Sequence, residues 1–263
     1  MPVSDSFSDE YDKTGKALDK ALVPRHWKGT VARLGALAAS FGDWPSGELA
    51  GASMAKLRQK LGDTRERFSL DYRKHLSDCT QEAMRWCQKT LILLAKVQRR
   101  SQKGRQAGRE RVSRWFADAN TDEAELDRIV DALQAGFKKI LAVLGSGRLV
   151  LTDHPQTRGS TLASSEAFVF TAREPVDGVH IEDAFFSAAN VLKGLKNWTR
   201  IQVHELSHRE LATVDKFYAW QGIKPVSGGF PAADALVNAE SWAFFCADAA
   251  GALTDSDRQA ALQ

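Results

Sequence analysis

The segment VHELSHRELATVDKFYAW, residues 203–220, gathers side chains that bind metal ions and move protons. Within it, His204, Glu205 and His208 form the pattern HExxH. Residues four apart share one face of a helix, so the two imidazoles can point at a single cation. Zinc binds neutral imidazole well and prefers four tetrahedral ligands. The pattern therefore predicts a zinc (Zn2+) site on a helix.

Glu205 follows the first histidine directly and can serve as a proton acceptor. On a helix it is turned by about 100° from His204, so its carboxylate reaches a water on the cation rather than the cation itself. Zinc lowers the pKa of such a water towards about 7, and a neighbouring glutamate can take its proton. This arrangement would perform metal-assisted hydrolysis. The alternative interpretation is two histidines on an exposed helix face beside a salt-bridging glutamate.

A catalytic zinc ion needs a third protein ligand and keeps its fourth position for water. Two carboxylates are candidates: Asp215, after a turn that leaves the helix, and Glu240, from a later apolar helix, as in thermolysin-like enzymes. Position 214 is valine, which excludes a third histidine six residues after His208. His180 is a further candidate, although it falls in a predicted strand, where a surface or core histidine is the more common role.

The clearest element ahead of this segment is an amphipathic helix between residues 120 and 147. Apolar side chains recur there at spacings of three, four and one, which places them on one stripe. Asn120 and Glu123 match a capping box at its start, and Gly145 and Gly147 mark its end. The stripe predicts a helix with one face in the core.

The apolar period changes after this helix. Residues 148–152, 167–172 and 179–181 are short, rich in β-branched or aromatic residues and separated by turns, which predicts a small sheet. Helical patterns return over residues 192–211 and 232–250. Helices, then a small sheet, then two helices indicate an α+β fold that is mainly helical.

The first part of the chain has a mixed composition. A polar start leads to a Gly-, Pro- and Ser-rich loop at residues 42–53, and short helices are expected in this part. Beyond residue 53 the composition is helical up to about residue 100. We therefore divide the chain into an N-terminal helical extension, residues 1–69, and a domain that carries the HExxH pattern, residues 70–263.

Composition and cysteine usage restrict the class of protein. Apolar residues at 43% and charged residues at 26% are ordinary for a soluble globular protein. No apolar run is long enough to span a membrane, and the acidic start does not match a signal peptide. Three cysteines without a CxxC pair argue against a disulfide framework and against cysteine-bound zinc. We expect a protein made in the cytoplasm without a classical signal peptide, which contacts no membrane; export by a specialised secretion route stays open.

A basic run between Lys96 and Arg114 could contact phosphate or an acidic partner. No aromatic residue interrupts the run to stack on bases, so nucleic acid is not the expected partner. A solvated helix and loop is the simpler interpretation.

Three consecutive segments resemble the aspzincin metalloendopeptidases, which include deuterolysin and the peptidyl-Lys enzymes. HELSH is followed by TVDKFY and then by NAESWAFF. Thr213, Asp215 and Tyr218 fall on the Thr, Asp and Tyr of the family's middle element. The resemblance implies a zinc endopeptidase in which Asp215 is the third ligand and Tyr218 donates a hydrogen bond to the oxyanion. Glu240 would then orient a ligand histidine or line the substrate pocket.

The chain departs from the family pattern at several positions. Ala212 and Ala219 replace glycines, and alanine costs about 1 kcal/mol where φ must be positive, so a turn of different shape is expected. The acidic pair associated with lysine selection is incomplete, because Glu240 keeps one acid and Ala243 replaces the other. This argues against lysine specificity.

The resemblance implies a zincin-like metallopeptidase domain with its HExxH pattern on the active-site helix and Glu205 as general base. Its substrate would be a protein or peptide, and the strand at 167–172 could pair with extended substrate. A narrower hypothesis is a delivered bacterial toxin or effector, with an inhibitor or immunity protein as partner. Two other classes stay open: a nucleic-acid- or protein-binding module with a structural metal, and an inactive zincin-like scaffold.

Overall fold

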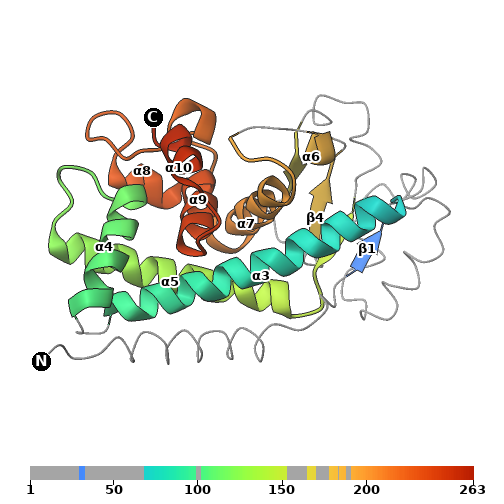
Figure 1. Cartoon of the computed structure of the whole chain (residues 1–263), viewed down its shortest axis with the longest axis horizontal. Helices are drawn as coiled ribbons and strands as arrows, with labels where there is room; N and C mark the ends of the chain where they lie inside the picture. Colours follow the sequence, from blue (N-terminus) through green and yellow to red (C-terminus); the bar gives the residue numbers. More distant parts are fainter. Residues whose placement is uncertain are drawn as a thin grey trace, which may run out of the picture.

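The computed structural model describes residues 30–32, 68–98, 102–152, 165–169, 178–182, 184–187 and 191–263. Most of these residues are helical (Figure 1). The helices are α3 (Leu70–Gln98), α4 (Gln102–Phe116), α5 (Glu123–Gly145), α6 (Ala184–Ser187), α7 (Leu195–Leu211), the 3-10 helix η4 (Ala219–Gln221), α8 (Ala232–Val237), α9 (Ala239–Ala249) and α10 (Asp255–Ala261). The strands are β1 (Thr30–Ala32), β2 (Val150–Thr152), β3 (Ala167–Phe168) and β4 (Gly178–Ile181). The predicted α+β class is confirmed.

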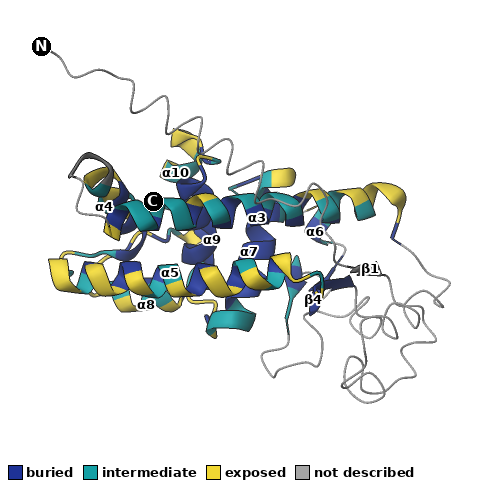
Figure 2. Ribbon diagram, turned by 90° about the horizontal axis from the view of Figure 1, so that it is seen from below, coloured by how far each residue is buried: buried dark blue, intermediate teal, exposed yellow. Residues whose placement is uncertain are grey.

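The helical part is built on α3, which has 29 residues and runs alongside α5 (Figure 1). Helices α7 and α9 also pack on α3 and on each other, and both are dark blue over most of their length in Figure 2, where that colour marks buried residues. Burying apolar area is the main favourable contribution to folding. A helix enclosed on several sides, such as α7, can therefore hold polar side chains only where each finds a partner.

Aromatic side chains fill the space between α4, α5 and α9. The ring of Phe116 meets that of Phe245 edge-on, with centroids 5.3 Å apart, and Phe137 lies 5.1 Å from Trp242. Gly136 allows this close approach, because a Cβ at that position would lie 2.5 Å from the Trp242 ring. Such edge-to-face and tilted pairs contribute beyond their buried area.

Helix α5 confirms the predicted amphipathic helix but begins later than the capping pattern indicated. Its N-cap is Asp122, whose carboxylate accepts a hydrogen bond from Glu125 N at 2.7 Å. Asn120 instead donates its backbone N–H to Asp118 Oδ1 at 2.9 Å, so the proposed Asn120–Glu123 box is wrong. Asp and Asn are nearly equal as caps, and the tight turn at 118–121 decides between them.

The sheet contains the three predicted strand regions and one more strand. Its order is β1-β2-β4-β3; β1–β2 and β2–β4 are parallel, and β3–β4 is antiparallel. Thr30–Ala32 was expected within a helical part, yet it forms β1 by pairing with β2. Thr30 and Val31 are β-branched and favour a strand, but three residues are too few for a recognisable strand pattern, and only the pairing with β2 defines the strand. The other helices expected before residue 68 lie outside the described residues, and the division at residue 69 stays a prediction.

The basic run is partly used inside the fold. Arg109 forms ion pairs with Glu123 and Asp127 of α5, and Arg114 contacts the buried carboxylate of Asp248 at 2.8 Å. These side chains join α4 to α5 and α9. None of the helices in the described part of the chain combines the length and apolar character needed to span a bilayer.

Candidate metal centre

Helix α7 carries His204, Glu205 and His208 through the interior of the molecule. His204 is 5% exposed and Glu205 is 6% exposed. The sequence predicted the helix but not this degree of burial. The exposed-face interpretation of the pattern is therefore wrong: desolvating two imidazoles and a carboxylate requires partners for each of them.

The chain reverses direction at the end of α7. Ala212 caps the helix in the left-handed conformation, with φ 55° and ψ 34°, and its N–H bonds the carbonyl of His208 at 3.1 Å. The position therefore keeps a conformation that suits glycine, contrary to the expected change of turn shape. The reversal brings the Thr213 carbonyl to 2.7 Å from His208 Nδ1.

Asn238 holds the returning segment in place. The predicted helix at 232–250 is interrupted there, and Asn238 lies between α8 and α9 with φ −90° and ψ 117°. Its backbone pairs with that of Val214, and its Oδ1 accepts the N–H groups of Lys216 and Phe217 at 2.9 and 3.1 Å. Asp215 stands between these anchored residues, so its backbone is fixed from both sides.

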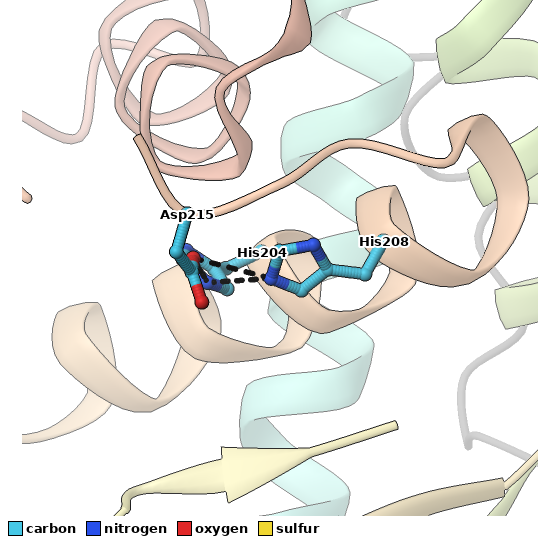
Figure 3. A group of neighbouring side chains, drawn as sticks. All are labelled: His204, His208 and Asp215. Carbon is cyan, nitrogen blue, oxygen red and sulfur yellow. Dashed lines mark hydrogen bonds and ion pairs between the residues drawn. The ribbon is translucent and has the colours of Figure 1, made fainter. Parts of the chain in front are cut away.

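The side chains of His204, His208 and Asp215 converge on one point (Figure 3). The Nε2 atoms of the two histidines are 3.1 Å apart. Asp215 Oδ1 lies 3.0 Å from His204 Nε2 and 3.3 Å from His208 Nε2. Ligand atoms about 2.0–2.1 Å from a tetrahedral zinc ion lie about 3.3–3.4 Å apart. The three atoms thus have nearly the spacing of a zinc ligand set.

The opposite nitrogen of each imidazole is already engaged. His208 Nδ1 meets the Thr213 carbonyl, which only accepts, so the proton must lie on Nδ1 and the lone pair on Nε2. His204 Nδ1 lies 3.0 Å from Glu240 Oε2. Hydrogen bonds of this kind orient metal-binding histidines and make them more basic. The residues present therefore fit a zinc ion.

Glu240 does not belong to the converging set. Its Oε2 contacts the far nitrogen of His204, and its Oε1 accepts the N–H of Ala219 at 3.3 Å. His180 lies on β4, buried and stacked on Phe168, and it is not among the converging residues. Among the described residues, only Asp215 joins the two histidines in this geometry.

The charges of the centre shift its titration. Burial lowers the pKa of His204, but hydrogen bonds with Asp215 and Glu240 outweigh it and raise that pKa to about 10. Burial raises the pKa of Asp215, but the two histidines lower it well below its usual range. Without a cation, a proton on His204 satisfies the carboxylates. Zinc binding must displace that proton.

Glu205 and Tyr218 complete the described surroundings. Burial raises the pKa of Glu205, and His204 and His208 oppose that rise. Burial and the nearby Asp215 carboxylate raise the pKa of Tyr218, so its hydroxyl keeps its proton. The Tyr218 ring lies parallel to that of His204, with centroids 6.2 Å apart. A carboxylate and a phenol thus flank the converging ligands.

Sequence reasoning missed two residues that position this centre. Asn238 appeared only as part of a family-like segment, and Arg200 was not considered. The spacing does contain a signal for Arg200, because it lies four residues before His204 and so on the same face of α7. Its partner across the helix pair, Glu240, could not be known before α7 and α9 were placed together.

A buried helix with two histidines, a returning aspartate and a flanking glutamate defines a candidate metalloenzyme centre. A family model described as lysine-specific metallo-endopeptidase matches residues 101–247. The chain belongs to this family, the aspzincins, which are zinc metalloenzymes of the peptidase class. No curated protein matches the chain.

Proposed function

We propose that this protein is a zinc-dependent endopeptidase whose metal ligands are His204, His208 and Asp215. The observation that carries the proposal is the convergence of three donor atoms within 4.8 Å, each held from behind by a hydrogen bond or an anchored backbone. A zincin-like arrangement, with α7 as the active-site helix, is part of the same proposal.

The bound zinc ion would polarise the scissile carbonyl and lower the pKa of a water. Glu205 would accept a proton from the attacking water and pass it to the leaving amine, and its raised pKa suits a group that both takes and returns a proton. Tyr218 would donate its hydroxyl proton in a hydrogen bond to the carbonyl oxygen, where negative charge develops. The raised pKa of Tyr218 supports this role, because the phenol stays protonated.

The substrate would bind as an extended chain along β3. This strand is last in the sheet order and pairs with β4, and α7 packs against both strands. An added peptide strand gains main-chain hydrogen bonds from such an edge. The partner expected is therefore a protein or an unfolded peptide segment.

We infer that lysine specificity does not extend to this chain. A lysine side chain needs an unpaired carboxylate, but Glu240 and Glu166 both face Arg200, and Asp215 faces the histidines. Ala243 supplies no second acid. A degenerate peptide library should show no enrichment of lysine beside the cleaved bond. Strong enrichment would contradict this inference.

The surface beside Tyr218 favours apolar substrate side chains. Trp220 is 63% exposed, and its ring lies parallel to that of Tyr218 with centroids 6.3 Å apart. Val214, next to Asp215, is 45% exposed. We expect Trp220→Ala to raise the KM for peptides with apolar residues near the cleaved bond and to leave the zinc content unchanged.

The first test is zinc per chain after dialysis against a weak chelator. About one zinc ion per chain is expected from three protein ligands, absent in Asp215→Ala and retained in Glu205→Gln. Glu205→Gln should lower kcat by roughly 10²–10⁴-fold, because it removes the proton acceptor and leaves the ligands. Zinc retained by Asp215→Ala would remove Asp215 from the ligand set.

Hydroxamate binding and cleavage of the peptide library separate the proposal from its alternatives. A structural metal in a binding module would leave no open coordination position, so a hydroxamate inhibitor would not bind. An inactive scaffold would bind zinc and hydroxamate but cleave nothing in the library. The toxin or effector role, its immunity partner and the specialised export route stay hypotheses from the sequence.

A further inference from the structure

Arg200 connects the metal centre to the edge of the sheet. It lies one helical turn before His204 and is 3% exposed. Its Nη1 donates to Glu240 Oε2 at 2.7 Å, its Nη2 to Glu166 Oε2, and its Nε to Asn197 Oδ1 at 3.0 Å. Three donors of one guanidinium are therefore used on three different side chains.

One arm of this arrangement reaches the metal ligand. Glu240 Oε2 accepts from both Arg200 and His204, and Oε1 accepts the N–H of Ala219, the residue after Tyr218. Glu240 is 1% exposed, so an unpaired charge there would be costly. The planar guanidinium pairs this charge and sets the direction of the carboxylate.

The other arm reaches β3. Glu166 directly precedes that strand, and its carbonyl accepts the N–H of Glu182 at 3.2 Å, beside β4. Its carboxylate receives Arg200 and also the amide of Asn197, at 2.8 Å. Arg200 therefore contacts both Glu166, at the start of the edge strand, and Glu240, which accepts a hydrogen bond from His204.

We propose that Arg200 is a positioning residue that fixes the distance between the substrate-binding edge β3 and the metal ligand His204. It acts through Glu240 on the ligand and through Glu166 on the strand. The strand half of this proposal rests on the proposed peptidase function, whereas the ligand half requires only that the centre binds zinc.

Arg200→Lys tests the ligand half. The ammonium keeps the charge but lacks the fork that reaches three acceptors at once. We expect its zinc affinity, measured by chelator competition, to fall about 10- to 100-fold, the usual effect of losing a hydrogen bond that orients a ligand. Arg128→Lys is the matched control: Arg128 is a 73% exposed side chain on α5, and its replacement should change nothing.

Glu240→Gln gives a second measurement of the ligand half should Arg200→Lys fold poorly. It should lower zinc affinity by a similar factor. The double variant should lose little more than either single variant, because both act on the same histidine. Wild-type zinc affinity in folded Arg200→Lys or Glu240→Gln, or additive losses in the double variant, would overturn the ligand half.

Glu166→Gln tests the strand half. We expect unchanged zinc affinity, an unchanged KM for a blocked dipeptide, and a KM about tenfold higher for an octapeptide long enough to lie along β3. That factor is the scale of one hydrogen bond to a charged group. An equal rise for both substrates, or no rise for the octapeptide, would overturn the strand half. A wild-type protein that binds zinc but cleaves neither peptide would refute the peptidase function, and zinc affinity would still test Arg200.

Discussion

Helix α9 carries two buried carboxylates with opposite surroundings. Glu240 at its start shares Arg200 with a second acid, Glu166, and contacts a metal-ligand candidate. Asp248 near its end receives Arg114 at 2.8 Å, Arg258 at 3.2 Å and the indole of Trp115 at 2.9 Å.

The balance of charge distinguishes the two regions. Around Asp248, three arginines (Arg111, Arg114 and Arg258) form ion pairs with one buried acid, and these pairs join α4, α9 and α10. Around Glu240, carboxylates outnumber the guanidinium, and Asp215 adds another, so a further cation is favoured. Burial of an acid is therefore not in itself a sign of function. The excess of carboxylates over cations supports the proposed metal site.

The largest stability effect should come from Asp248→Asn. Removing the charge leaves three guanidinium groups and an indole N–H with a weaker acceptor, which should lower the free energy of unfolding by about 3 kcal/mol. Zinc stoichiometry should not change. Urea unfolding and zinc analysis on the same samples would check both statements. Zinc loss in the folded variant would end the distinction between the two regions.

Glu240→Gln, in contrast to Asp248→Asn, should change the binding of zinc. The zinc affinity is expected to fall about 10- to 100-fold, because the amide is a weaker partner for His204 Nδ1. Measured beside Asp248→Asn, this variant sharpens the contrast between a carboxylate that positions a ligand and one that joins helices. Equal zinc affinities in the two variants would remove that contrast.

The pH dependence of the metal-free protein should reflect the acid-rich region. The pKa of His204 rises from 6.5 to about 10, so its stabilisation is complete below pH 6.5 and is lost as the pH rises towards 10. Burial raises the pKa of Glu240, but Arg200 and His204 lower it from 4.5 to about 2. Its stabilisation is present above pH 4.5 and is lost as the pH falls towards 2.

Urea unfolding of chelator-treated protein should therefore show both declines. Bound zinc should remove the decline in stability at alkaline pH, because the metal replaces the proton on His204. An unchanged unfolding free energy between pH 6.5 and 10 in the metal-free protein would contradict the assignment.

Ala212→Gly should produce the smallest change, a gain of about 1 kcal/mol in the free energy of unfolding. Ala212 has φ 55°, a conformation that costs alanine more than glycine. Ala219→Gly is the matched control, since Ala219 stands at the other alanine-for-glycine position without a positive φ. It should not stabilise the protein. A gain in both variants would contradict this assignment to the positive φ of Ala212, because glycine raises the entropy of the unfolded chain and cannot stabilise the protein through it.

Much of the local structure follows from the sequence. The apolar stripe predicted α5, the β-branched segments predicted β2, β3 and β4, and the period after residue 192 predicted α7. These patterns are short-range, so each could be recognised without a partner. The strand β1 could not, because Thr30–Ala32 becomes a strand only by pairing with Val150–Thr152.

The sequence by itself determined that two imidazoles and a glutamate share a helix, since the spacing of His204, Glu205 and His208 depends only on helical geometry. It left Asp215 and Glu240 open as the third ligand. Tertiary structure decided how they are placed: Asn238 breaks a helix to hold the Asp215 segment, and Arg200 holds Glu240 behind the ring of His204. Those contacts join residues some twenty to forty positions apart, and no local pattern encodes distances between separate helices.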